Sequence, residues 1–228
     1  MTKLHIFDMD GTLLRSTASL EISKSAGAHE QALAIEQGWL AGEISDVGFW
    51  ERCLPLWEGI DDAQIDEAFR AAPWMEGVAE VFADIAARAE HSVVITQSPQ
   101  FFVDRLLAWG AENTYGTRVA PGFGVSQRQL ISAEDKVAIV VDLLGRYGLR
   151  ESSCIAYGDS TSDIPLFEWL PHTVAINASA RVKGLARTAY DGNDLRGAYS
   201  AARNMLATPV GQIGQSQPRP ASTCNGQR

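Results

Sequence analysis

Two aspartates stand one residue apart at the end of the first apolar run of the chain. Leu4-His5-Ile6-Phe7 is followed by Asp8-Met9-Asp10 and then by Gly11. An apolar run bounded by glycine predicts a buried parallel strand, so both carboxylates should emerge at its carboxyl end, where open α/β sheets bind ligands. Neighbouring carboxylates repel each other unless a cation or a shared proton holds them. We therefore expect a divalent-metal site, and the alternative is a turn in which aspartate and glycine only redirect the chain.

Oxyanion-binding groups follow a second apolar run. The run 92–95 ends in Thr96-Gln97-Ser98, directly before Pro99 and an apolar helical segment. A strand-to-helix corner of this kind offers hydroxyls and backbone N–H groups to an anion. Taken alone, Thr96 is also compatible with an ordinary hydroxyl at the end of a strand.

A lysine and two more aspartates complete the set of candidate chemical groups. Lys136 lies in the first turn of an expected helix, where a cation is unfavourable against the helix dipole and so gives weak evidence of a nearby anion. A third apolar run, 153–157, ends in Gly158 and then Asp159, with Asp163 four residues further on. Each of these residues alone fits a surface or helix-capping role.

In chain order, the pattern Asp-x-Asp, Thr, Lys and Gly-Asp-(x)3-Asp resembles the four motifs of the haloacid dehalogenase superfamily of phosphohydrolases. The resemblance extends over residues 1–205, and the subgroup most similar to this chain is the phosphoserine phosphatase-like enzymes. It implies an α/β fold with a doubly wound, Rossmann-like parallel sheet and a helical cap inserted after the first strand. It also implies a phosphoric monoester hydrolase.

The resemblance assigns roles to the motif residues. Asp8 is expected to be the nucleophile that forms an aspartyl-phosphate, and Asp10 the general acid and base. Mg²⁺ is the expected cofactor, bound by Asp8, the Asp10 carbonyl and Asp159, with Asp163 binding through water or fixing Lys136.

The expected phosphate-binding residues bind the phosphoryl oxygens. The negative charge of these oxygens must be offset before the Asp8 carboxylate can approach a phosphate dianion. They are Asp10, Gly11, Thr96, Gln97 and Lys136. The expected catalytic set is Asp8, Asp10, Thr96 and Lys136.

The organisation of the chain follows from where strand patterns give way to helical spacing. Helical periodicity at 28–40, 46–57 and 62–72 predicts an insertion, and later strands are expected near 93–96, 116–120, 154–157 and 173–176. We therefore expect a core of residues 1–16 and 75–207 and a cap of residues 17–74. Residues 208–228, rich in Gln, Pro, Gly and Ser, are expected to be disordered.

The substrate is less well defined by the sequence. Phosphoserine phosphatases carry a glutamate and an arginine that hold the ammonium and carboxylate groups of the substrate, and these positions align with Thr17 and Cys53. A shift of one residue places Arg52 in the arginine role, and Glu21 lies one turn beyond Thr17.

Aromatic residues of the cap favour a larger substrate. Phe49, Trp50 and Trp57 have helical spacing, which is typical of core packing but also allows a ligand platform. Together with Thr17 and Cys53 they are the candidate substrate-binding residues. We expect a bulky sugar-bearing or aromatic phosphate ester of secondary metabolism.

Four alternatives stay open beside this expectation. They are a phosphoserine phosphatase, a phosphomutase or phosphotransferase, a non-enzymatic metal- and phosphate-binding module, and a dehalogenase. The dehalogenase is disfavoured because it needs neither Asp10 nor the metal-binding acids.

Composition narrows the expected partners and location. The 228 residues include 46% hydrophobic residues, a formal net charge of −9 and three cysteines. Such an acidic chain argues against a nucleic-acid partner, and we see no apolar run long enough to enter a membrane. A small-molecule phosphate ester is the expected partner, and a cytoplasmic location is the default for a chain with few, widely spaced cysteines.

Overall fold

The computed structural model describes residues 2–207, and its centre is a parallel β-sheet. In this part of the chain the sheet has six strands in the order β3-β2-β1-β4-β5-β6. The strands are β1 (Leu4–Phe7), β2 (His91–Pro99), β3 (Asn113–Thr117), β4 (Cys154–Gly158), β5 (Thr173–Ile176) and β6 (Thr188–Tyr190). The chain leaves β1 on one side toward β2 and returns on the other side to β4, which makes the end of β1 the topological switch point of the sheet. The doubly wound α/β fold expected from the sequence is confirmed.

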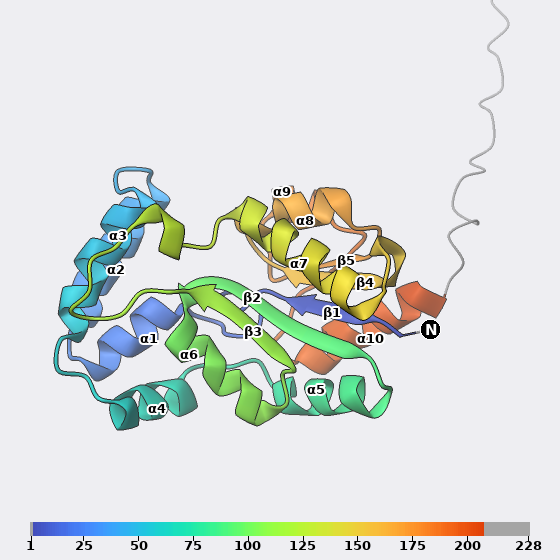
Figure 1. Ribbon diagram of the computed structural model, residues 1–228, viewed down its shortest axis with the longest axis horizontal. Helices are drawn as coiled ribbons and strands as arrows, with labels where there is room; N and C mark the ends of the chain where they lie inside the picture. The colour runs from blue at the N-terminus through green and yellow to red at the C-terminus, as the bar shows by residue number, and fades with distance from the viewer. Residues whose placement is uncertain (1, 208–228) are drawn as a thin grey trace, which may run out of the picture.

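Helices cover both faces of the sheet (Figure 1). The face formed by Phe7 and its neighbours packs against α5 (Val78–Ala87), α6 (Gln100–Val103) and α10 (Leu195–Ala207), whereas Leu4 and Ile6 face α7 (Ala133–Tyr147), α8 (Ile164–Trp169) and α9 (Ala180–Leu185). Alternate residues of a strand point to opposite faces, so β1 contributes to two apolar clusters at once. Because β1 is buried on both faces, its position in the sheet is firmly specified.

The segment between β1 and β2 is helical before α5 begins. It contains α1 (Ala18–Ser25), α2 (His29–Leu40), α3 (Asp46–Cys53), the 3₁₀ helix η1 (Leu54–Trp57) and α4 (Asp62–Ala71). We call this set the inserted helices. One apolar cluster continues from the sheet into them, and it includes Phe69, whose ring lies 5.4 Å from that of Phe102 on α6.

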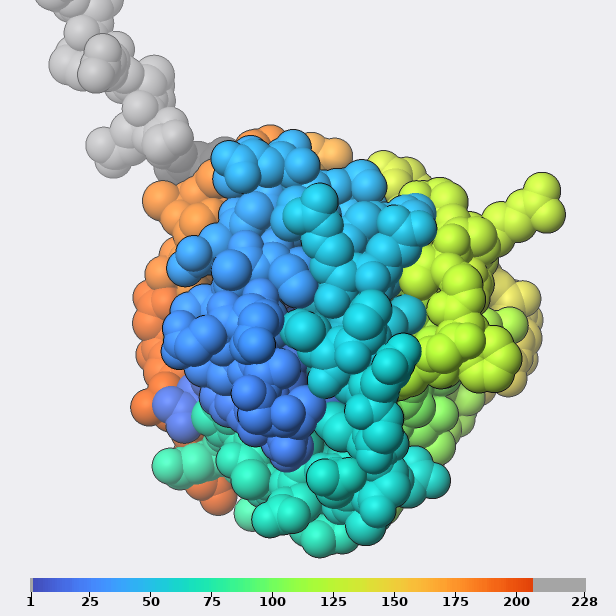
Figure 2. Space-filling view, turned by 90° about the vertical axis from the view of Figure 1, so that its left-hand side faces the viewer, coloured from blue at the N-terminus to red at the C-terminus, as the bar shows by residue number. Residues whose placement is uncertain are grey.

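A long connection from β3 to α7, residues 118–132, runs beside the inserted helices and contains the 3₁₀ helix η3 (Gln127–Gln129). In Figure 2 this yellow-green segment lies directly against the blue and cyan surface of the inserted helices. The remaining 3₁₀ helices are η2 (Asp104–Trp109), η4 (Glu151–Ser153) and η5 (Thr161–Asp163).

Some element boundaries differ from those expected. The helix expected at 46–57 changes to a 3₁₀ helix after Cys53, where Pro55 has no backbone N–H to continue the α-helical pattern. The strand expected at 116–120 occupies Asn113–Thr117, because Thr114 and Tyr115 form a half-buried strand that lacks a continuous apolar run. The helix α1 and the strand β6 were not expected.

Two expectations concern regions or properties outside the sheet. The expected disordered segment, 208–228, lies outside the described residues. Among residues 2–207, no helix combines the length and the apolar character that crossing a bilayer requires.

Candidate active site

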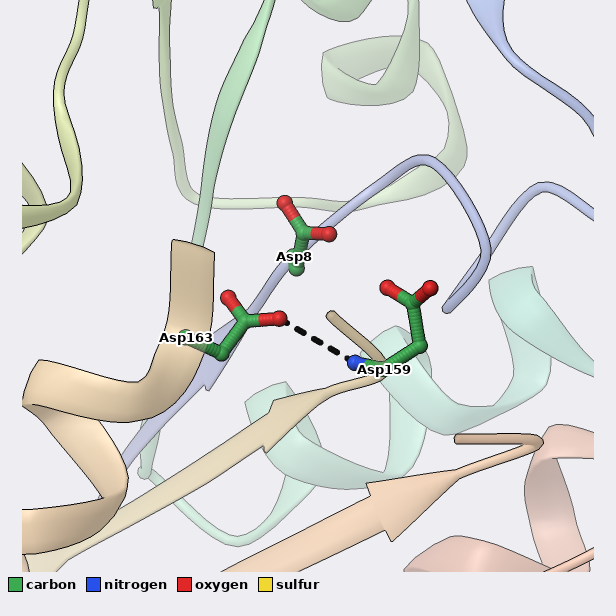
Figure 3. A group of neighbouring side chains, drawn as sticks. All are labelled: Asp8, Asp159 and Asp163. Carbon is green, nitrogen blue, oxygen red and sulfur yellow. Dashed lines mark hydrogen bonds between the residues drawn. The ribbon is translucent and has the colours of Figure 1, made fainter. Parts of the chain in front are cut away.

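Three carboxylates meet at the carboxyl edge of the sheet. Asp8 follows β1, Asp159 follows β4 and Asp163 ends η5, and one oxygen of each lies within 4.8 Å of the others. Figure 3 shows the three side chains directed into the same space above the ends of the strands. Residues separated by up to 155 positions are thus brought together, as expected from the switch point of the sheet.

Lys136 forms ion pairs with two members of this cluster. Its side chain is 1% exposed, and its Nζ lies 2.9 Å from Asp8 Oδ1 and 2.7 Å from Asp163 Oδ1. Nζ also donates to Ser162 Oγ at 3.0 Å. Burial alone would lower the pKa of Lys136, but the charges of Asp163 and Asp8 outweigh burial and hold this pKa well above its usual range. The lysine is therefore a permanent buried cation.

A capping box fixes the start of α7 and so the position of Lys136. The Ser132 hydroxyl accepts from the Asp135 backbone N–H, and the Asp135 carboxylate accepts from the Ser132 backbone N–H. The capping box expected from the sequence is present, with Asp in place of the usual Glu or Gln.

Asp163 has both carboxylate oxygens engaged. Oδ1 accepts from Lys136, and Oδ2 accepts from the backbone N–H groups of Asp159 at 3.1 Å and Ser160 at 3.2 Å. A side chain on Gly158 would not fit, because its Cβ would lie 2.3 Å from Asp163 Cγ. Of the two roles left open for Asp163, these contacts favour fixing Lys136 and the loop after β4.

Asp159 is the member of the cluster that Lys136 does not bond. Its Oδ1 accepts from the Thr12 hydroxyl at 3.2 Å. Burial is the main cause that raises the pKa of Asp159 to about 9, and the charges of Asp8 and Asp163 raise it further. An excess of buried carboxylate beside Asp8 is what a hard divalent cation with oxygen ligands would neutralise. The donor set therefore fits a divalent metal ion.

Asp8 directly follows β1, and its carboxylate lies beside the Lys136 ammonium. Its backbone N–H donates to the Tyr157 carbonyl at 2.9 Å, which continues the β1–β4 pairing by one residue. Burial raises the pKa of the Asp8 carboxyl to about 6, although the charge of Lys136 acts in the opposite direction. The carboxylate thus stays ionised near neutral pH because a cation lies beside it.

Asp10 is held by two donors. Its Oδ1 accepts from the Ala18 backbone N–H at 3.0 Å, and its Oδ2 accepts from the Ser98 hydroxyl. Burial raises the pKa of Asp10 to about 7, and the charges of Asp8 and Glu36 add to this effect. A carboxyl group with such a pKa exchanges protons readily near neutral pH.

Four of the five expected phosphate-binding residues, Asp10, Gly11, Thr96 and Gln97, line one cavity together with Asp8 and Asp159, whereas Lys136 does not line it. The register of β2 against β3 shifts between Ile95 and Pro99, and Thr96 and Gln97 lie in this irregular stretch, where a bulge redirects side chains. The Gln97 side chain donates to the Ile131 carbonyl at 3.1 Å. Gly11 has φ +76°, and a Cβ there would lie 2.1 Å from Asp159 Oδ2, so only glycine fits.

A cavity of about 640 Å³ opens from these groups toward the inserted helices. Thr17, Phe49 and Trp50, three of the five candidate substrate-binding residues, line this cavity. Cys53 and Trp57 do not line it. Their side chains are buried, and the Trp57 indole N–H donates to Ser23 Oγ at 2.8 Å. The expected substrate contacts of Cys53 and Trp57 are therefore not supported by their placement, because both pack inside the inserted helices.

The structure also adds residues that were not among the candidate site residues. Ser98, Arg15 and Glu36 line the cavity. Ser98 had a sequence signal, since it directly follows Thr96 and Gln97. Glu36 had none beyond its place in a helix, because only the packing of α2 on α1 brings it to the cavity.

The comparisons with known proteins agree with this geometry. The family model of haloacid dehalogenase-like hydrolases matches residues 6–168. A phosphoserine phosphatase of a Polaromonas species is 26% identical over 198 residues, which cover 82% of this chain and 84% of that protein. A phosphoglycolate phosphatase of Pectobacterium atrosepticum is 31% identical over 181 residues, which cover 69% of this chain and 72% of that protein.

Solved structures share the fold. A substrate-bound phosphoserine phosphatase complex superposes with a TM-score of 0.73 at 20% identity, and the match covers 88% of this chain and 98% of that one. A phospho-aspartyl intermediate analogue of phosphoserine phosphatase gives a TM-score of 0.72 at the same identity and coverage.

The chain belongs to the haloacid dehalogenase-like hydrolase family, as the match of the family model shows. The carboxylates at the switch point of the sheet and the buried lysine fit this family. Within that family it is a phosphatase, a phosphoric monoester hydrolase that resembles the phosphoserine phosphatases.

Proposed function

We propose that this chain is a Mg²⁺-dependent phosphatase that hydrolyses a small-molecule phosphate monoester through a phosphorylated Asp8. The observation that supports this most directly is the contact of Asp8 Oδ1 with the Lys136 ammonium at 2.9 Å, beside Asp159, which makes no ion pair within residues 2–207. A nucleophilic carboxylate next to a buried cation and a metal-type donor set is what attack on a phosphate dianion requires.

In the first half-reaction, an oxygen of Asp8 attacks phosphorus and the bond between phosphorus and the ester oxygen breaks. Asp10 gives its proton to the departing oxygen, so an alcohol leaves and Asp10 becomes a carboxylate. In the second half-reaction, water gives a proton to Asp10 and attacks phosphorus. The bond between phosphorus and Asp8 then breaks, and inorganic phosphate leaves.

Positive charge and donors offset the charge of the phosphoryl oxygens. The Thr96 hydroxyl and the backbone N–H group of Gln97 bind these oxygens. The Lys136 ammonium, whose three donors contact Asp8, Ser162 and Asp163, offsets their charge without a free donor. The expected contact of the Gly11 N–H group is not supported, because this group donates to the Leu14 carbonyl at 2.7 Å. Mg²⁺ held by Asp8, Asp159 and the Asp10 carbonyl supplies further positive charge when it is bound.

The inserted helices act as a cap in this proposal. Residues 17–74 form the cap, and residues 1–16 and 75–207 form the catalytic core. The cap lines the cavity with side chains of α2 and α3, and closure of such an element excludes bulk water while Asp8 attacks the substrate.

Phosphoserine is the substrate that the relatives favour. The phosphoserine phosphatases among them match at 26% identity or less, and they favour phosphoserine over the bulky ester expected from the aromatic residues. The cavity supports the bulky ester as a second candidate, because about 640 Å³ lies within the range of pockets that hold drug-sized ligands. Phe49 and Trp50 line this cavity.

The test is hydrolysis of para-nitrophenyl phosphate with Mg²⁺ and with EDTA, followed by a panel of phosphoserine, sugar phosphates and aryl-glycosyl phosphates. We expect Mg²⁺-dependent release of inorganic phosphate, with one atom of ¹⁸O incorporated from labelled water. Transfer of phosphate to a sugar hydroxyl without release would indicate a phosphotransferase. Binding without turnover would indicate a binding module.

A further inference from the structure

Arg15 is a cation in an acidic cavity. Among residues 2–207, it is the only lysine or arginine that lines the cavity of about 640 Å³. The acidic residues that line this cavity are Asp8, Asp10, Glu36, Asp46, Glu134 and Asp159. Within the part of the chain that the structure describes, the Arg15 guanidinium nevertheless forms no ion pair. Its donors are therefore available to an anion that enters the cavity.

The backbone of Arg15 is fixed beside the loop that carries Asp10. Its N–H group donates to the Pro73 carbonyl at 3.0 Å, where the chain returns from the inserted helices. The preceding residue, Leu14, forms isolated β-bridges with Asp10 and with Trp74. The position of Arg15 is thus tied to the catalytic loop rather than to α2 and α3.

A smaller cavity shows at which end of the larger one Arg15 lies. Its volume is about 310 Å³, and the residues that line it are Gly11, Arg15, Asp159, Asn177 and Asn193. Gly11, Arg15 and Asp159 line both cavities. Of the described residues, none in the inserted helices lines the smaller cavity. Arg15 therefore lies at the carboxylate end of the larger cavity and not at its aromatic wall.

The other groups at this end offer few donors to a phosphoryl group. All three donors of Lys136 contact protein oxygens, and the Gly11 N–H group donates to a backbone carbonyl. The proposed donors that remain, the Thr96 hydroxyl and the Gln97 N–H group, carry no charge. During transfer, negative charge is spread over the three equatorial oxygens of the phosphoryl group. A guanidinium matches two such oxygens with parallel N–H groups.

We propose that Arg15 is a further phosphate-binding residue, whose guanidinium binds oxygens of the phosphoryl group of the substrate and of the inorganic phosphate that is formed. The ligand is the phosphate dianion itself, so Arg15 contributes the same factor to the affinity for every phosphate ester. This inference rests on the proposed phosphatase function, because that function places the phosphoryl group at the sheet edge.

The experiment measures the inhibition constant of inorganic phosphate against hydrolysis of para-nitrophenyl phosphate in the presence of Mg²⁺. Arg15→Gln should raise this constant by about tenfold, as for the loss of a hydrogen bond between charged groups. Arg15→Lys should raise it by a smaller factor, because an ammonium keeps the charge but lacks the planar pair of donors. The value of kcat/KM for para-nitrophenyl phosphate should fall in the same order.

Two controls separate a contact with phosphate from other effects of the charge. Arg118→Gln removes an exposed arginine that lines neither cavity, and it should keep the wild-type inhibition constant. The second control is a pair of inhibitors, phosphoglycolate and 2-hydroxyethyl phosphate, which differ by a carboxylate in place of a hydroxymethyl group. The ratio of their inhibition constants should be the same in the wild type and in Arg15→Gln.

An unchanged inhibition constant of inorganic phosphate in Arg15→Gln would overturn the proposal, and so would an equal rise in Arg118→Gln. A changed ratio within the inhibitor pair would overturn it too, because Arg15 would then bind the carboxylate. Should Arg15→Gln not fold, an unchanged constant in Arg15→Lys would have the same meaning.

Failure of the phosphatase proposal is seen separately, as absent hydrolysis of para-nitrophenyl phosphate by the wild type. In that case calorimetric titration of the wild type, Arg15→Gln and Arg118→Gln with inorganic phosphate and Mg²⁺ tests the phosphate contact of Arg15 directly. We expect weaker binding in Arg15→Gln alone, and equal affinities in all three proteins would overturn the proposal.

Discussion

Replacing Asp159 by asparagine should make the metal-free protein more stable while it removes the metal site. The carboxyl group of Asp159 has a pKa of about 9, raised first by burial and then by the charges of Asp8 and Asp163. Its pKa in the unfolded chain is lower, so folding takes up a proton between the two values. The contribution of Asp159 to the free energy of unfolding is therefore greatest at low pH, and it decreases as the pH rises toward about 9. Asparagine resembles the protonated form and should abolish this loss.

The size of the effect follows from the pKa. Each pKa unit corresponds to about 1.36 kcal/mol, so the interval from an unfolded pKa of about 4 to the folded pKa of about 9 sets a limit of roughly 7 kcal/mol. Asp159 is only partly buried, and solvent screening reduces this figure to about 2 kcal/mol at pH 8. For a chain of this length, about 2 kcal/mol corresponds to a rise in Tm of roughly 4–8 °C.

The assay is thermal unfolding of wild type and Asp159→Asn at several pH values in EDTA and in Mg²⁺. We expect Mg²⁺ to raise the Tm of the wild type and to leave the variant unchanged, since binding to the folded state alone stabilises it. Asp142→Asn, on the exposed side of α7, is the matched control and should follow the wild type. A variant that is less stable than the wild type in EDTA, or that keeps the Mg²⁺ response, would refute the reasoning.

Three further outcomes test other parts of the site. Asp8→Asn should lower kcat by at least about a thousandfold in a phosphate-release assay, and near-normal turnover would exclude the covalent route. Ser98→Ala removes a donor to Asp10, so kcat/KM should fall by about tenfold for an alkyl phosphate but little for para-nitrophenyl phosphate, whose leaving group needs no proton. Equal losses for both substrates would contradict this role. Trp57→Phe leaves Ser23 without its indole partner and should cost about 1–3 kcal/mol in urea unfolding at unchanged KM. A raised KM at unchanged stability would instead place Trp57 against the substrate.

The central strands could be predicted from the sequence because their burial leaves a direct signal. The runs that form β1, β4 and β5 are mostly apolar, and every residue in them is buried. β3 and β6 could not be located as well, since Asn113–Thr117 and Thr188–Tyr190 are short edge strands of mixed polarity. At the edges of a sheet, pairing with a neighbour rather than local sequence decides where a strand lies.

For the site, too, the residues with a local sequence signal could be predicted, and those positioned by distant parts of the chain could not. Asp8 and Asp159 could be identified because each directly follows a buried strand. Lys136 gave only a weak local signal, and its two ion pairs join positions 128 and 27 residues away. Glu36 could not be found at all, since the hydroxyls that hold it come from another helix and no spacing rule connects them.

Glu36 lies on a different part of the chain from the residues at the edge of the sheet, and this affects how the ligand preference of such an enzyme can change. The residues proposed to act on the phosphoryl group come from the ends of β1, β2 and β4 and from α7. Glu36, in contrast, lines the cavity from α2. Random mutagenesis confined to α2 and α3 should therefore yield variants that prefer other ligands but still hydrolyse phosphate esters. Random mutagenesis of the residues at the carboxyl ends of the strands should instead yield mostly inactive variants.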